Sequence, residues 1–203
     1  MSPVFQPLDS GKVIPKYPVA KKHKIGDVLR MALFAKEYIN IKEKDSSGKW
    51  VDSLKENGDP KKQLLLHGVI VEENTMQIKT ADGLRKPECG ERVRLYVAKM
   101  DLRHYMEGIG KSGEGVGDIV NWEITHGQEF LLGGKEKGGR ITSQKKIDEL
   151  RMNGSRPGIY GTFTLERCPD ELTQALANEA KTEYDDANKN SGPSVSQEDE
   201  MPF

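Results

Sequence analysis

Basic and aromatic side chains alternate along one short segment of this chain. Arg92, Arg94 and Tyr96 occupy every second position, and aliphatic residues lie between them. Successive side chains of a β-strand point to opposite faces, so these three would share one face. Lys and Arg hold phosphates, and an aromatic ring stacks on any base with roughly 1–3 kcal/mol. The segment therefore has the chemistry to hold a single nucleic-acid strand.

Two tryptophans and a glycine-rich loop add further candidates. Trp50 lies in a polar, turn-rich region, and Trp122 lies in the middle of a predicted strand. A place in the core is an equal alternative for Trp122, because Val120 and Ile124 alternate with it. The basic loop over residues 133–140 could clamp a phosphate backbone or be a plain surface loop. The predicted nucleic-acid-binding residues are Trp50, Arg92, Arg94, Tyr96, Trp122, Lys135, Lys137 and Arg140.

Catalytic chemistry is not indicated by the remaining motifs. Residues 108–113 resemble the end of a phosphate-binding loop, but Tyr105 stands where that motif needs glycine. Further glycines at 113, 115 and 117 argue against the helix that must follow, and we predict a glycine-rich connector. The four histidines match no zinc or nuclease signature, and the two cysteines form no metal pattern or disulfide framework. We predict a protein that is not an enzyme and uses no cofactor or metal.

Charge is divided unevenly along the chain. Its 203 residues carry 31 basic and 32 acidic side chains, a net charge of −1. Nine acidic and two basic residues lie from Asp170 to the end, a net charge of −7. The other 29 basic and 23 acidic residues leave residues 1–169 with a net charge of +6. A basic body with an acidic tail points to a polyanionic partner, and the tail could compete for the same surface.

The chain ends in an acidic run followed by an apolar tip, Met201-Pro202-Phe203. A terminal phenylalanine joins an aromatic ring to a carboxylate, and a basic surface with a small apolar pocket could hold both. An ordinary solvated acidic tail is the alternative. The end resembles the C-terminal tip of bacterial and phage single-stranded DNA-binding proteins. The matching residues are Glu198, Asp199, Glu200, Met201, Pro202 and Phe203.

That resemblance implies a function and a set of partners. In the family, the tip recruits replication, recombination and repair enzymes, while the body coats exposed single-stranded DNA. This chain would be a divergent member, in the cytoplasm of a bacterium or of a phage host, and could form homo-oligomers. Two alternatives remain: a metal-dependent nuclease that carries a recruitment tip, and an interaction protein that mimics the tip without binding DNA. No apolar run reaches the roughly 20 residues that span a membrane.

The elements that must position these residues are mainly strands. Strand patterns cover residues 64–72, 76–79, 92–99, 118–125 and 158–167, while residues 25–42 fit a strand or a helix, with a strand favoured near Tyr38. A short helix is expected from Ser143 to Gly154, and a second begins after Asp170. We predict a five-stranded antiparallel barrel like the oligonucleotide-binding (OB) fold. A β-sandwich or an SH3-like barrel would give a similar pattern.

Four regions follow from this reading. Residues 1–24, with four prolines, would be an extended basic arm that contacts nucleic acid or only aids solubility. Residues 25–168 would form the OB-like domain that binds single strands. Residues 169–187 would form the C-terminal helix. Residues 188–203 would be a disordered linker that ends in the acidic, partner-binding tip.

Overall fold

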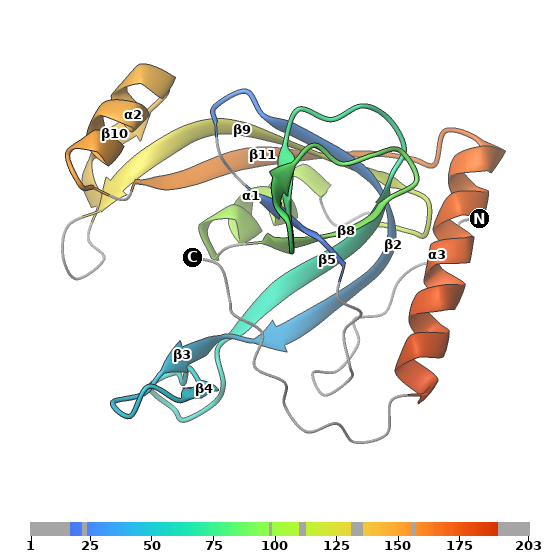
Figure 1. Cartoon of the computed structure of the whole chain (residues 1–203), viewed down its shortest axis with the longest axis horizontal. Coiled ribbons are helices and arrows are strands. Elements are labelled where there is room, and N and C mark those ends of the chain that lie inside the picture. The colour runs from blue at the N-terminus through green and yellow to red at the C-terminus, as the bar shows by residue number, and fades with distance from the viewer. Residues whose placement is uncertain are drawn as a thin grey trace.

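The chain folds into a mainly β structure with a strongly curled sheet (Figure 1). This computed structural model describes residues 17–21, 24–97, 99–109, 113–130, 136–155 and 157–190. Within them lie eleven strands: β1 (Val19–Lys21), β2 (Val28–Asn40), β3 (Lys42–Lys44), β4 (Trp50–Asp52), β5 (Lys62–Ile70), β6 (Gln77–Thr80), β7 (Gly83–Arg85), β8 (Arg92–Val97), β9 (Ile119–Phe130), β10 (Glu136–Ile141) and β11 (Gly158–Glu166). The helices of this part are α1 (Lys99–Ile109), α2 (Gln144–Met152) and α3 (Glu171–Asn190).

Nine of these strands form one sheet. Its order is β10-β9-β2-β5-β8-β1-β6-β7, and β11 pairs with β9 on the other side. All pairings are antiparallel except that of β1 with β8. In Figure 1, β9 and β11 lie at the top, β2 bends down the right side, and β5 and β8 run below. The small β3–β4 hairpin projects at the lower left, and β10 with α2 projects at the upper left.

Period-two patterning places one face of the sheet on a core inside the curl. In β8, buried and half-buried residues alternate without a break, as the sequence predicts. The inward side chains of β2, β5, β8 and β9 meet in one cluster, which includes Leu33, Leu66, Leu95 and Trp122. A bulge between Leu33 and Ala35 changes the register of β2 against β5, which strengthens the local twist.

Helix α1 packs against both β11 and β8. Tyr105 meets Phe163 of β11 edge-on, with ring centroids 5.3 Å apart. Gly108 permits this approach, because a Cβ at that position would overlap the carbonyl oxygen of Phe163. The glycine that resembled part of a phosphate-binding loop is therefore a helix-packing residue. We expected a connector here, and the pattern of this helix was missed.

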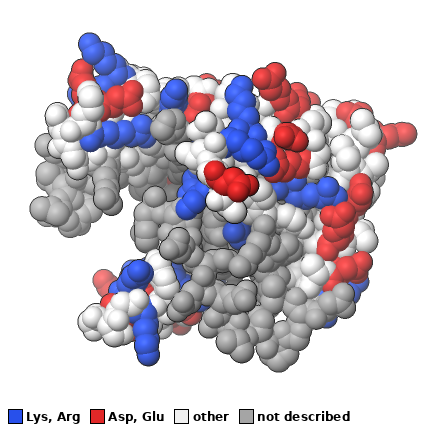
Figure 2. All heavy atoms as spheres, viewed as in Figure 1, with Lys and Arg blue, Asp and Glu red and all other residues white. Residues whose placement is uncertain are grey.

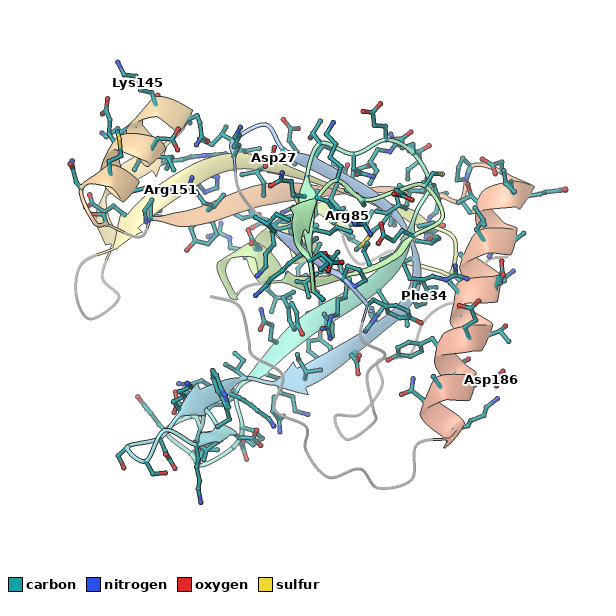
Figure 3. The ribbon with its side chains drawn as sticks, viewed as in Figure 1. Asp27, Phe34, Arg85, Lys145, Arg151 and Asp186 are labelled. Atoms are coloured by element: carbon teal, nitrogen blue, oxygen red, sulfur yellow. The ribbon has the colours of Figure 1, made fainter. Side chains whose placement is uncertain are left out.

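Helix α3 covers the outer face of the sheet over β2 and β5. A second cluster of buried side chains joins them, including Ala32, Phe34, Ala177 and Tyr184. Phe34 points from the sheet toward α3 (Figure 3), and its ring centroid lies 6.0 Å from that of Tyr184. The outer face is thus divided into a part under α3 and a part that α3 leaves uncovered.

A buried polar network fastens α3 to the sheet. Glu37 of β2 accepts hydrogen bonds from the Nε2 of His67 at 2.7 Å and from the Tyr184 hydroxyl at 3.1 Å. All three side chains are buried. Burial lowers the pKa of His67, although the bond to Glu37 opposes this effect, so the imidazole is neutral at neutral pH.

Several sequence predictions require correction. The prediction of five strands is wrong, because the described part of the chain contains eleven. The N-terminal arm was expected to end at residue 24, but Val19–Lys21 form a strand inside the sheet. Residues 25–42 are mostly strand, and α3 continues to Asn190, beyond the expected end at 187. The short helix after Ser143 is confirmed as α2.

The part of the chain described here contains no helix that is both long enough and apolar enough to cross a membrane.

Candidate nucleic-acid interface

Strand β8 presents its polar side chains on the outer face of the sheet. Val93 and Leu95 point into the core, so Arg92, Arg94 and Tyr96 point outward, as their spacing predicts. Arg94 lies over the Tyr96 ring, with its guanidinium carbon 5.8 Å from the ring centroid. A cation over the ring face is electrostatically favourable and holds both groups in one orientation.

Two lysines from distant parts of the sequence extend this surface. Val19 of β1 lies beside Arg94 in the parallel pairing and beside Lys79 of β6 in the antiparallel one. Lys21, two residues after Val19, lies on the same face of the sheet as Arg94 and Tyr96, and it pairs with Gln77 of β6. Because Ala20 and Ile78 are core residues, Lys21 and Lys79 point outward. We call Lys21, Lys79, Arg94 and Tyr96 the basic face.

Among the described residues, no carboxylate forms an ion pair with the cations of the basic face. Neither Arg94, Lys21 nor Lys79 makes an ion pair in the described part of the chain. The Nε of Arg94 is buried without a hydrogen-bond partner. Burial, and then the nearby charge of Lys79, lower the pKa of Lys21 from 10.5 to about 8. Unpaired like charges held together favour an anion, since a phosphate would relieve both the repulsion and the desolvation.

Arg92 lies on the same strand face but in a different environment. Its Nη2 lies 2.8 Å from Glu183 and 3.9 Å from Glu179, both on α3. Acidic side chains gather along the right side of Figure 2, where α3 runs. Arg92 was predicted to contact nucleic acid, and here its charge is already neutralised by the helix.

Trp122 is a core residue, and the prediction that it binds nucleic acid is wrong. Its side chain is 0% exposed, and its ring stacks on Phe163 with centroids 5.4 Å apart and planes 8° apart. Its inward direction follows from the register of β9, in which Val120 and Ile124 point the same way. No base can reach a ring in this position.

Trp50 lies on the β3–β4 hairpin, away from the basic face (Figure 1). It is half-buried and pairs directly across the hairpin with Lys44, whose Nζ lies 5.2 Å from the ring centroid. The turn of the hairpin is held by the side chain of Asp45, which accepts hydrogen bonds from the backbone of Ser47 and Lys49. The hairpin therefore offers an aromatic ring and a lysine together, separate from Tyr96.

Arg140 lies at the base of the second projection, built from β9, β10 and α2. It is exposed and donates a hydrogen bond to Thr125 at 2.9 Å. Lys145 and Arg151 lie further along the same projection, on α2 (Figure 3). Residues 131–157 contain seven basic and three acidic side chains, so this segment carries a net charge of +4. The side chains of Lys135 and Lys137, also predicted to bind, lie outside the described residues.

The tip residues 198–203 also lie outside the described residues. So does most of the predicted arm, including Lys22 and His23. Lys24 is described, and next to it Ile25 donates a backbone hydrogen bond to Gln144 of α2 at 2.8 Å. Ile25, four residues after Lys21, thus contacts the basic projection at α2.

Sequence reasoning missed Lys21 and Lys79. Lys21 was assigned to a basic arm, and Lys79 was placed in a strand without a role. No local signal connects either of them to Tyr96, because the pairing of β1 between β8 and β6 brings together residues 21, 79 and 96. The only available hint was the run of basic residues at 21–24.

Comparisons with protein-family models, with curated proteins and with solved structures found no match to this chain. Across the described residues, no three His, Cys, Asp or Glu side chains lie together in a way that could hold a metal ion. The geometry of the basic face and the sequence of the tip are therefore the features that bear on function.

Proposed function

We propose that this chain binds single-stranded DNA without sequence preference, and that its acidic tip recruits replication, recombination or repair enzymes. The observation that carries the proposal is the basic face, where three cations without an ion pair among the described residues share one sheet face with an outward tyrosine. Phosphates would bind Lys21, Lys79 and Arg94, and a base would stack on Tyr96. No step of this function requires catalysis.

The order of the long strands supports an OB-like assignment. In chain order, β2, β5, β8, β9 and β11 correspond to the five strands of an OB barrel. β2 pairs with both β5 and β9, and α1 lies between the third and fourth of these strands. OB folds bind oligonucleotides on the face of the second and third strands and on the loops that flank it. Here that face belongs to β5 and β8, and it contains Arg94 and Tyr96.

The two projections support the same assignment. The β3–β4 hairpin connects the first and second of these strands, and the β10–α2 segment connects the fourth and fifth. They contain Trp50 and Arg140, and each projection displays Lys and Arg side chains in Figure 2. We propose that a single strand lies across the basic face and extends toward the β10–α2 segment. The linker before the tip would let the tip search a volume around the DNA-bound protein.

A binding isotherm tests this proposal. We expect the full chain to bind a single-stranded oligomer of about 20 nucleotides, more tightly than the matching duplex, at about 50 mM salt. Replacing Tyr96 with Ala should weaken binding by roughly ten-fold, the loss of one stacked base. Trp122→Phe provides the matched control, because it changes an aromatic ring that lies in the core.

Three outcomes would contradict the proposal. Absence of any binding at low salt would favour a protein that mimics the tip. Release of labelled nucleotides in Mg²⁺ or Mn²⁺ would favour a nuclease. Equal binding by the wild-type chain and the Tyr96→Ala variant would mean that the DNA contact lies away from the basic face.

Deleting residues 198–203 should abolish capture of a partner enzyme while leaving DNA binding intact at moderate salt.

A further inference from the structure

Arg92 and Arg94 are two residues apart on one strand face, yet only Arg92 faces α3. Its Nη2 contacts Glu183 at 2.8 Å, and Glu179 lies one helical turn earlier at 3.9 Å. Arg94 instead lies over the Tyr96 ring and pairs across the sheet with His67 and Val19. Among the described residues, the sheet therefore presents two arginines in the same orientation, of which Arg92 forms ion pairs and Arg94 forms none.

The contact between Arg92 and Glu183 is not the geometry of a strong structural pair. A single nitrogen of the guanidinium meets the carboxylate, whereas a two-nitrogen contact would give more energy and a fixed orientation. The Nε of Arg92 is buried and has no hydrogen-bond partner. Both side chains are partly exposed, at 27% for Arg92 and 51% for Glu183. Exposed pairs of this kind contribute little to stability, and a competing anion can displace them.

Other contacts already hold α3 in place. Ala177, Ala180 and Tyr184 are fully buried against the sheet, and the Tyr184 hydroxyl binds Glu37. Docking of the helix therefore does not depend on Arg92. Glu183 lies beside Tyr184 in sequence, so the docked helix carries its carboxylate to the edge of the basic face.

We propose that Glu183 withholds Arg92 from nucleic acid, so that α3 sets where on the outer face a single strand binds. This inference rests on the proposed function. A strand that binds Lys21, Lys79 and Arg94 meets repulsion from Glu183 and Glu179 when it approaches Arg92. Arg92 is a latent phosphate-binding residue, and Glu183 acts as a specificity-determining residue for the path of the strand.

Neutral replacement of Glu183 tests the inference. Glu183→Gln keeps the size of the side chain and should bind a single-stranded oligomer roughly two- to five-fold more tightly at about 50 mM salt. The slope of log affinity against log salt should become steeper by about 0.7, the value for one added phosphate contact. Glu183→Ala, which suits a helix equally well, provides a second variant with the same expected result.

Two controls make the result specific to Arg92. Glu171→Gln removes the same charge from the same helix, about three turns away, and should leave affinity and slope unchanged. Arg92→Gln alone should change binding little, and in the Glu183→Gln background it should cancel the gain. The inference is overturned if Glu183→Gln behaves like Glu171→Gln, or if the gain persists without Arg92. If neither the wild-type chain nor the Glu183→Gln variant binds single strands, the proposed function fails as well.

Discussion

The two halves of the outer sheet face differ in their neighbours and not in their residue types. One half carries Arg94 beside Tyr96, Lys21 and Lys79, without an acidic partner among the described residues. The other half carries Arg92, which is paired with Glu183 of α3. Two arginines of the same strand thus differ: the charge of Arg94 is available to a ligand, and the charge of Arg92 is neutralised. Tertiary packing, not the alternation along β8, determines which arginine can meet a phosphate.

The strongest predicted change comes from removing the buried tyrosine that docks α3 on the outer face of the sheet. Tyr184→Ala empties a fully buried site and should lower the free energy of unfolding by about 3–5 kcal/mol, as large aromatic truncations do. Urea denaturation measures this change. Leu172→Ala, on the same helix but 71% exposed, should change the free energy by less than about 0.5 kcal/mol. Similar losses for the two variants would mean that α3 is not docked through Tyr184.

The next effect separates the two arginines directly. Arg94→Gln should weaken single-strand binding by roughly ten-fold, about 1.4 kcal/mol, because a charged hydrogen bond to phosphate is lost. Arg92→Gln makes the same chemical change two residues away and should have little effect. Fluorescence anisotropy with a labelled oligomer compares the two variants. If Arg92→Gln caused the larger loss, the strand would lie under α3, and the comparison would be reversed.

Acidification should lower the free energy of unfolding through His67, which lies in the buried network between α3 and the sheet. The pKa of His67 is lowered in the folded state. Between that lowered pKa and the ordinary pKa of 6.5, the unfolded chain therefore binds a proton that the folded chain does not bind. The contribution of His67 to the free energy of unfolding is therefore fully present above pH 6.5 and is lost as the pH falls below that value. Between about pH 7.5 and 5.5 the free energy of unfolding should fall by about 1 kcal/mol.

The same experiment on His67→Gln isolates this contribution. The variant cannot titrate, so its stability should change less over the same pH range, whatever its absolute stability. His126 will keep part of the dependence, because burial lowers its pKa as well. An unchanged pH profile in His67→Gln would show that another group is responsible.

The smallest expected effect concerns the basic face. Lys21, with a pKa of about 8, is charged at pH 7 and mostly neutral at pH 9. Single-strand affinity should therefore fall by roughly three-fold over that range, and the salt slope should decrease by at most about 0.7. Lys21→Arg remains charged and should remove the pH dependence. An oligomer of deoxyadenosine suits the measurement, because its bases do not titrate there.

Sequence alone was enough to predict the local features of this protein. It predicted the alternation of β8, the helix that begins after Ser143, the helix after Asp170, and the separation of a basic body from an acidic end. These features depend on periods of two or 3.6 residues, on helix-capping residues and on counts of charge. Each can be read within a short window, because the physical interactions that produce it are themselves local.

Which of these residues come together depends on the tertiary fold. Lys21 and Lys79 share a sheet face with Tyr96 because β1 pairs between β8 and β6, and the basic face depends on that register. Trp122 points inward because β9 faces the core, and Arg92 is neutralised because α3 docks beside it. Strand register and helix docking are set by burial of apolar surface between distant segments, which no short window of sequence contains.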